Sequence, residues 1–95
     1  MAKSQSMLQS DADSWVMYRR WAKVSSSNVL AIHYDRHSKT LSVQFKGKAK
    51  GVKYPIYEYS QVPDTVAKQM YITGSKGSFV WATLRNGSYA VKGPM

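Results

Sequence analysis

The 95-residue sequence contains no cysteine, which excludes disulfide bonds, iron–sulfur clusters, thiolate zinc sites and cysteine nucleophiles. Acidic residues are scarce, because five Asp and Glu stand against 14 Lys and Arg and leave a net charge of +9. No apolar run approaches the roughly 20 residues of a transmembrane helix, and the polar first residues lack the apolar stretch of a signal peptide. We therefore expect a soluble, cytoplasmic protein of bacterial or phage origin.

The chain does have enough apolar residues for one small domain. Hydrophobic residues make up 43% of it and aromatic residues 13%, which is too apolar for a disordered chain. Residues 1–13 are mostly polar and are expected to form a flexible arm, and residues 14–95 are expected to form one domain with a modest core. The surplus of positive charge favours a polyanionic partner, such as nucleic acid, an anionic membrane or an acidic protein.

An aromatic cluster over residues 15–21 opens the domain. As a helix, this segment would be capped by Asp13 or Ser14. As a strand, it would place Trp15 and Trp21 on the same face. The two interpretations are nearly equal, and a helix followed by an extended segment is slightly favoured.

The centre of the chain has the pattern of β-strands. Residues 29–35 are apolar and β-branched, and residues 40–45 alternate between apolar and polar, so the two segments predict an antiparallel hairpin. Residues 46–51 are basic and rich in glycine and predict a loop. Residues 52–59 predict a third strand. Because Pro55 cannot donate a hydrogen bond to a neighbouring strand, this strand lies at the edge of the sheet or Pro55 lies at its start.

Two short helices are expected after the strands. The first begins near Pro63 and Asp64 and ends at Gly74. The second covers residues 79–85, and residues 89–91 dock back as a short extended piece. The order predicts an α+β fold, with a small three-stranded antiparallel sheet followed by two short helices packed on one face, plus an N-terminal helix or strand.

Five short motifs occur in an order that resembles the KTSC domain family. They are Ser26-Ser27-Asn28-Val29, then Ile32-His33-Tyr34-Asp35 with Leu41-x-Val43-x-Phe45, then Tyr57-x-Tyr59, then Val62-Pro63, and last Ser75-Lys76-Gly77-Ser78-Phe79 with Leu84-Arg85 and Tyr89. The resemblance spans about residues 24–91. It implies a small α+β domain that occurs at the C-terminus of some lysyl-tRNA synthetases and as free-standing bacterial and phage proteins, with RNA as the expected partner.

The sequence departs from the pattern of this family in three places. Residues 46–53 add a basic extension before the tyrosine pair. Phe79-Val80-Trp81 stands where the family has an aromatic residue followed by asparagine. The aromatic and arginine residues of the N-terminal cluster lie outside the family core. We expect partner contacts that are specific to this protein at these places.

Residues suited to catalysis are few. The five carboxylates show no motif spacing, and no serine lies in a G-x-S-x-G sequence. His33 and His37 are four residues apart, but across a strand and a turn, with only Asp35 as a third candidate ligand. We therefore expect a non-enzymatic monomer without a cofactor or a metal site.

The positive charge is concentrated in residues 36–53, which contain six Lys and Arg and no acidic residue. Its densest part holds Lys46, Lys48, Lys50 and Lys53, which suit contacts to phosphates without reading of the bases. Six engaged phosphates would give a slope of about −4 to −5 when log affinity is plotted against log salt concentration. A solvated loop whose lysines prevent a sheet edge from pairing with another chain would have the same composition.

Tyr57 and Tyr59 share one face of their strand and can serve as a stacking surface for bases. Packing in the core is the favoured interpretation, because Glu58 lies on the opposite face and needs water.

Lys76 lies in the stretch Ser75-Lys76-Gly77-Ser78 just before the second helix. There it can contact a phosphate, and Arg85 can clamp the same anion. A capped helix start explains this stretch as well and is favoured. Phe79 and Trp81 are expected in the core.

An alternative site lies in the N-terminal cluster. Its members Trp15, Tyr18, Arg19, Arg20 and Trp21 have the composition of a protein-interface hot spot. A segment that closes the small core has the same composition.

We therefore predict a small basic binding module that contacts RNA or another nucleic acid. The residues assigned to this contact are Lys46, Lys48, Lys50, Lys53, Tyr57, Tyr59, Lys76 and Arg85. The alternative is a phage- or bacterium-encoded module that binds a host protein through the N-terminal cluster and inhibits or modulates it.

Overall fold

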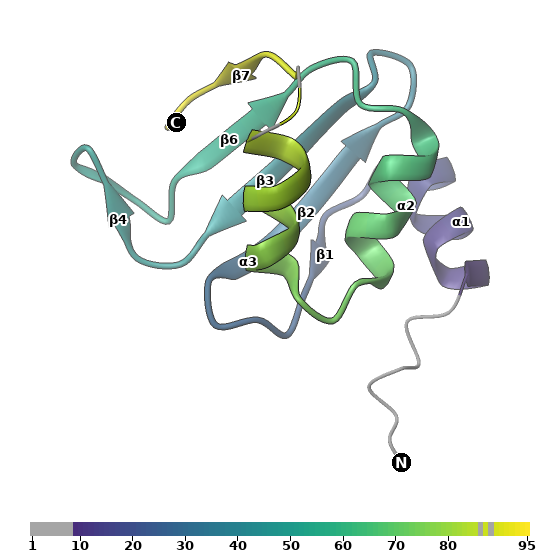
Figure 1. Cartoon of the computed structure of the whole chain (residues 1–95), viewed down its shortest axis with the longest axis horizontal. Coiled ribbons are helices and arrows are strands. Elements are labelled where there is room, and N and C mark those ends of the chain that lie inside the picture. Colours follow the sequence, from purple (N-terminus) through teal and green to yellow (C-terminus); the bar gives the residue numbers. More distant parts are fainter. Residues whose placement is uncertain (1–8, 86, 88) are drawn as a thin grey trace.

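The computed structural model describes residues 9–85, 87 and 89–95. These residues form an α+β fold in which helices lie over one face of an antiparallel sheet (Figure 1). The helices are α1 (Gln9–Tyr18), α2 (Asp64–Ile72) and α3 (Lys76–Phe79), which continues as the π-helical segment η2 (Val80–Arg85). The strands are β1 (Ala22–Lys23), β2 (Val29–Asp35), β3 (Thr40–Phe45), β4 (Lys48–Ala49), β5 (Val52–Lys53), β6 (Ile56–Tyr59) and β7 (Val91–Lys92).

The main sheet has the strand order β1-β2-β3-β6-β7, and β4 pairs with β5 in a separate hairpin. The predicted hairpin of residues 29–35 and 40–45 is confirmed as β2 and β3, which pair antiparallel from Asp35 opposite Thr40 to Val29 opposite Phe45. The predicted sheet of three strands is incomplete, because β1 and β7 extend it on both sides. Each of these strands has two residues, which is too short for the alternation that reveals a strand in sequence.

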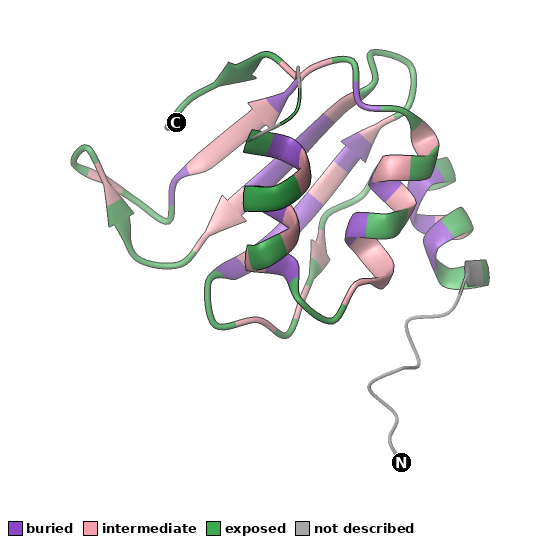
Figure 2. Ribbon diagram, viewed as in Figure 1, coloured by how far each residue is buried: buried purple, intermediate pink, exposed green. Residues whose placement is uncertain are grey.

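Cross-strand register places the core side chains of the sheet in rows on the helix-covered face. One row contains Ile32, Val43 and Tyr57, and the next contains Tyr34, Leu41 and Tyr59. Figure 2 shows buried segments along β2 and β3 beneath the helices. Trp15, Met70 and Leu84, which are almost fully buried, close the core from the helix side. Burial of each such side chain contributes about 1.5–3 kcal/mol.

The N-terminal cluster begins with a helix, as slightly favoured from the sequence, and β1 is the extended segment after it. Helix α1 starts at Gln9 and buries Ala12 and Trp15 completely, so the expected arm of residues 1–13 is too long. Residues 1–8 of that arm lie outside the described residues. Inside the core, the Trp15 ring lies 6.3 Å from the Tyr34 ring and 5.1 Å from the Tyr71 ring, measured between centroids.

The segment expected as one strand over residues 52–59 is divided. Tyr54 has a positive φ of 53°, and the chain turns there from β5 into β6. Pro55 lies between the two strands, so its missing N–H removes no ladder hydrogen bond, while its carbonyl accepts from the Phe45 N–H at 2.9 Å. Strand β6 begins directly after Pro55, as the second alternative expected. It is not at the edge of the sheet, because β7 pairs with its free side. The loop expected over residues 46–51 contains β4.

The first predicted helix is confirmed as α2, with Pro63 at its N-cap position. The second helix begins at Lys76, three residues before the predicted start. None of the helices in the described part of the chain is both long and apolar enough to span a membrane.

Candidate nucleic-acid groove

A basic groove lies between the β4-β5 hairpin, strand β6 and the segment η2. Its volume is about 600 Å³. The cations along it are Lys46, Lys48, Lys50 and Arg85, and its aromatic residues are Phe45, Tyr57, Tyr59 and Tyr89. Val91 and Gly93 complete the lining from the C-terminal segment. Among the described residues no Asp or Glu lines the groove, so the charged side chains of its lining are all positive.

A side pocket of about 280 Å³ adjoins this groove. Phe45, Lys46 and Arg85 line both, and the side pocket adds Trp81 and Asn28 among others. Figure 1 shows the β4-β5 hairpin projecting from the body of the molecule, while the helix that begins with α3 lies over the sheet. Residues from the middle and the end of the chain therefore meet at one site.

The hairpin presents its lysines on a tight turn. Ala49 and Val52 are cross-strand partners, so Lys50 and Gly51 form the two-residue connection. Both have positive φ, at 49° and 81°, which is the pattern of a type I′ turn. A lysine in this left-handed region costs about 1 kcal/mol relative to glycine, so the sequence keeps a lysine where a less strained residue would fit.

The base of the hairpin is fixed to the loop before β2. The Lys46 N–H donates to the carbonyl of Asn28 at 2.8 Å, and the Lys46 ammonium donates to the carbonyl of Ser26 at 2.6 Å. The Tyr54 N–H closes the hairpin by donating to the carbonyl of Gly47 at 2.8 Å. Lys46 is thereby held at the junction of the groove and the side pocket.

The two candidate tyrosines have different environments. Tyr59 is only 3% exposed, and burial raises the pKa of its hydroxyl. Tyr57 is half-buried, and the edge of its ring meets the Phe45 ring at a centroid distance of 5.6 Å. Core packing, the favoured interpretation, holds for Tyr59, which leaves Tyr57 as the more accessible ring of the pair.

Arg85 comes from the last turn of η2 and forms a pair with Trp81. Its guanidinium carbon lies 4.3 Å from the centroid of the indole ring. Trp81 is 60% exposed, so its expected place in the core is wrong. The reason is helix geometry: Val80 and Leu84 form the buried stripe of η2, and Trp81 is rotated away from that stripe. Phe79 packs against the core, as expected.

Lys76 does not reach this groove. Its side chain is buried, with 4% exposure, and its ammonium donates to the carbonyl oxygens of Tyr71 and Thr73. These carbonyls lie at the C-terminal end of α2, where a positive charge is favourable. Burial lowers the pKa of this ammonium. The predicted phosphate contact is therefore wrong, because Lys76 caps the preceding helix instead.

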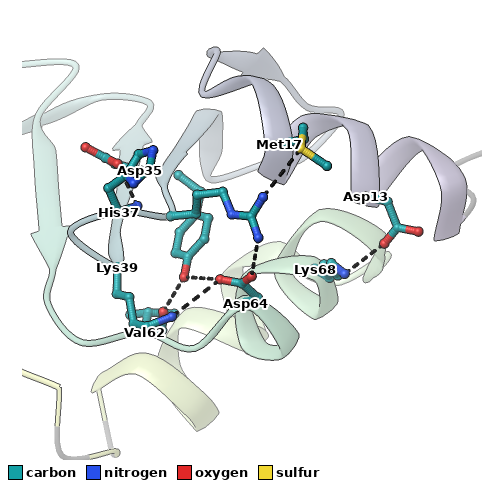
Figure 3. Close-up of polar contacts among 10 residues, drawn as sticks. Asp13, Met17, Asp35, His37, Lys39, Val62, Asp64 and Lys68 are labelled. Atoms are coloured by element: carbon teal, nitrogen blue, oxygen red, sulfur yellow. Dashed lines mark hydrogen bonds and ion pairs between the residues drawn. The ribbon is translucent and has the colours of Figure 1, made fainter.

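The basic run of residues 36–53 is divided between two ends of the molecule. Arg36 and Lys39, at the turn between β2 and β3, each place a nitrogen 3.7 Å from a carboxylate oxygen of Asp64. The Tyr34 hydroxyl shares its single proton between a carboxylate oxygen of the same Asp64, at 2.9 Å, and the carbonyl of Val62, at 2.5 Å. Figure 3 shows Lys39 and Lys68 directed at separate carboxylates, Asp64 and Asp13. Arg36 and Lys39 are therefore paired with Asp64, away from the β4-β5 hairpin.

Lys53 lies on the hairpin but does not line the groove. It is the cross-strand partner of Lys48, and its ammonium lies 5.3 Å from the centroid of the Tyr54 ring. Of the eight residues assigned to nucleic acid, six line the groove: Lys46, Lys48, Lys50, Tyr57, Tyr59 and Arg85. Sequence reasoning expected the C-terminal segment to dock on the domain but did not assign it, or Asn28, to the site. The pairing of β2 with β3 and of β6 with β7 brings these residues to the site from distant parts of the chain.

The N-terminal cluster is also divided. Trp15 is fully buried, and its indole N–H donates to the carbonyl of Arg20 at 2.9 Å. Tyr18 and Trp21 are 66% and 46% exposed. The Trp21 ring lies 5.3 Å from the ring of His33. The candidate protein interface therefore loses Trp15 and keeps its two outer aromatic residues.

The histidines do not meet further metal-binding side chains. Within residues 9–85, 87 and 89–95, no three His, Asp or Glu side chains gather in a way that could hold a metal ion. The carboxylate of Asp35 instead accepts a hydrogen bond from the His37 backbone N–H at 3.0 Å, and this bond lowers the pKa of Asp35.

Comparison with known proteins agrees with the fold. Residues 25–89 match the KTSC domain. The crystal structure of a KTSC domain protein from Yersinia pestis superposes with a TM-score of 0.64 and 27% sequence identity, and the match covers 77% of this chain and 93% of that chain. No curated protein matches the sequence significantly. The matched residues run from the loop before β2 to Tyr89 and include all four cations of the groove. This chain therefore belongs to the KTSC domain family.

Proposed function

We propose that this protein is a non-enzymatic module that binds single-stranded nucleic acid, with RNA favoured, in the basic groove. One observation carries the proposal. Four cations, as far apart in the sequence as Lys46 and Arg85, line one cavity, and no Asp or Glu of the described part of the chain lines it. Such a cavity attracts a polyanion, and lysine and arginine contacts to phosphates supply affinity that does not depend on sequence.

The shape of the groove favours a single strand over a duplex. Its aromatic residues lie in a recess, with Tyr57 only half-buried and Tyr59 beneath the surface. Bases of a duplex are stacked and cannot enter such a recess, whereas unpaired bases can turn toward an aromatic ring while the phosphates follow the cations.

Binding of labelled oligonucleotides, followed by fluorescence anisotropy, tests this function. The probes are single-stranded RNA, single-stranded DNA of the same sequence, and the RNA duplex. We expect salt-sensitive binding of the single strands, tighter for RNA, and about tenfold weaker binding by the variant Lys48→Gln/Lys50→Gln.

A matched variant, Lys23→Gln/Lys39→Gln, removes two exposed charges that do not line the groove. We expect it to bind within about twofold of the wild type. Equal losses in the two double variants would contradict a groove site, because they would show an effect of net charge alone.

A second candidate function is protein binding at the outer aromatic residues of the N-terminal cluster. This function is favoured by the exposure of Tyr18 and Trp21 and by Met17, which is 55% exposed and adjacent to Tyr18 in the chain. Large exposed apolar side chains that cluster are typical of interaction sites. Capture from a nuclease-treated host lysate tests it. A partner that is retained by the wild type and lost with Trp21→Ala supports this function, and the absence of such a partner argues against it.

A further inference from the structure

The side pocket carries the chemical groups that distinguish one nucleobase from another. It lies where the groove meets η2, and its polar residues include Ser27 and Asn28 from the loop before β2. The basic groove itself contributes cations and tyrosines, which bind phosphates and stack without selecting a base. A site with base selectivity therefore requires a hydrogen-bonding group next to the groove, and the side pocket supplies one.

The backbone of Asn28 is fixed by hydrogen bonds, whereas its side-chain carboxamide is available to bind a ligand. Its N–H donates to the Ser26 hydroxyl at 3.2 Å, and its carbonyl accepts from the Lys46 N–H at 2.8 Å. Its side-chain amide makes no hydrogen bond to another described residue, and Asn28 is exposed. A carboxamide offers one acceptor and two donors, which is the combination that pairs bidentately with the edge of adenine.

Gly77 leaves room for this carboxamide in its present position. A Cβ atom at Gly77 would lie 2.8 Å from the Nδ2 atom of Asn28, which is closer than such atoms approach. Gly77 has no positive φ, so backbone conformation does not require glycine here. The absence of a side chain at Gly77 is therefore what allows the Asn28 amide to occupy this wall of the pocket.

A nucleobase subsite also needs a flat surface on which the base can stack, and Arg85 and Trp81 provide it. The guanidinium lies against the indole ring at 4.3 Å, and both residues line the side pocket. A guanidinium plane stacks on bases. Because the indole already restricts this side chain, less conformational freedom is lost when a base adds to the stack.

We propose that the side pocket is a nucleobase subsite, in which one adenine stacks on the Arg85–Trp81 pair and hydrogen-bonds to the Asn28 carboxamide. This inference rests on the proposed function, because the phosphates next to that adenine occupy the basic groove. Asn28 then determines base preference, while Lys48 and Lys50 determine overall affinity.

Anisotropy with single-stranded decamers of adenylate, uridylate and cytidylate tests the subsite. We expect the wild type to bind the adenylate decamer at least about fivefold more tightly than the others. Asn28→Ala should reduce this ratio to nearly one while its affinity for the uridylate decamer stays within about twofold. Gly77→Ala should reduce the ratio as well, because its methyl group displaces the Asn28 amide. Gln69→Ala, which removes an exposed carboxamide from α2, should keep the ratio.

The outcomes separate the subsite from the function on which it rests. Equal, salt-sensitive binding of all decamers, or an adenylate preference that survives in Asn28→Ala, would overturn the subsite and leave the basic groove standing. Absence of salt-sensitive binding to every decamer would overturn both. Circular dichroism and thermal unfolding of each variant confirm that it is folded before its ratio is interpreted.

Discussion

Lys48 lies directly opposite Lys53 in the β4-β5 hairpin, in a strand pair that is only two residues long. Side chains that are cross-strand partners share a face, and like charges in this position destabilise the pair. Residues 46–54 contain no acidic residue that would offset the repulsion. We expect an anion bound at Lys48, on the groove side of this pair, to relieve the repulsion, which would couple the order of the hairpin to the occupancy of the basic groove.

Replacement of Lys53 by glutamate tests this coupling. Lys53→Glu turns the repulsive pair into an attractive one, so the backbone amides of β4 and β5 should exchange with deuterium more slowly in the free protein. Binding of single-stranded nucleic acid should weaken, because the new carboxylate repels phosphates. In the wild type, the oligonucleotide should slow exchange at the same amides. Faster exchange in the free variant would contradict the repulsion described above.

Replacement of Lys50 by asparagine separates stability from binding. Asparagine tolerates positive φ better than lysine does, so the free energy of unfolding should stay constant or rise by up to about 1 kcal/mol. Affinity should fall, and the salt slope should become shallower by about 0.7 for the loss of one phosphate contact. Chemical denaturation and a salt titration measure the two effects. Unchanged affinity would remove Lys50 from the binding surface.

The long, regularly patterned segments could be predicted from the sequence, whereas the groove could not. Strand β3 alternates between apolar and polar residues, and α2 carries clear start and stop signals. The two-residue strands β1, β4, β5 and β7 have no period that a sequence pattern can reveal. Strands β1 and β7 form because a neighbouring strand of the main sheet offers free hydrogen-bonding groups, which depends on the tertiary structure, whereas β4 and β5 pair with each other across the Lys50-Gly51 turn.

Lys76 and Trp81 show the same limit at the level of single side chains. Composition predicts an exposed lysine and a buried tryptophan, and the structure has the reverse. The start of the helix at Lys76 and the π-helical turn at Val80 set which positions face the core.

Substitution of Lys76 by methionine should lower stability without affecting binding. The carbonyls of Tyr71 and Thr73 lose their charged donor, which costs about 1–3 kcal/mol in free energy of unfolding. Because burial lowers the pKa of Lys76, the unfolded chain binds more protons than the folded one just below the ordinary lysine pKa. The variant should therefore fall further below the wild type in free energy of unfolding as the pH rises toward the ordinary lysine pKa.

The control for this substitution is the affinity of the folded variant for single-stranded RNA. It should remain within about twofold of the wild type, because Lys76 does not line the groove. If the variant is fully folded but binds the RNA much more weakly, Lys76 belongs to the binding surface, which would contradict its assignment as a helix cap.

Tyr34 should make the protein sensitive to alkaline pH. Burial and its hydrogen bond to Asp64 raise the pKa of this hydroxyl well above its usual range. The unfolded chain then loses the tyrosine proton near pH 10 while the folded chain keeps it, so stability falls as the pH rises above about 10. Burial raises the pKa of Tyr59 and Tyr71 as well, with an effect of the same sign.

The variant Tyr34→Phe isolates this contribution in urea unfolding. At pH 8 the variant should be less stable by about 1–3 kcal/mol, because Val62 and Asp64 lose a buried donor. The difference from the wild type should shrink above about pH 10, where the wild type alone loses the contribution of Tyr34. A difference that stays constant to pH 11 would show that Tyr34 titrates normally in the folded state.

The central claim, that four cations of one groove bind phosphates, is tested most directly by the salt dependence of affinity for a single-stranded RNA. Lys46, Lys48, Lys50 and Arg85 predict a slope of about −3 in the plot of log association constant against log salt concentration. The slope should fall to about −1.4 in Lys48→Gln/Lys50→Gln and remain at about −3 in Lys23→Gln/Lys39→Gln. The absence of salt-dependent binding, or the same slope in both double variants, would contradict the claim.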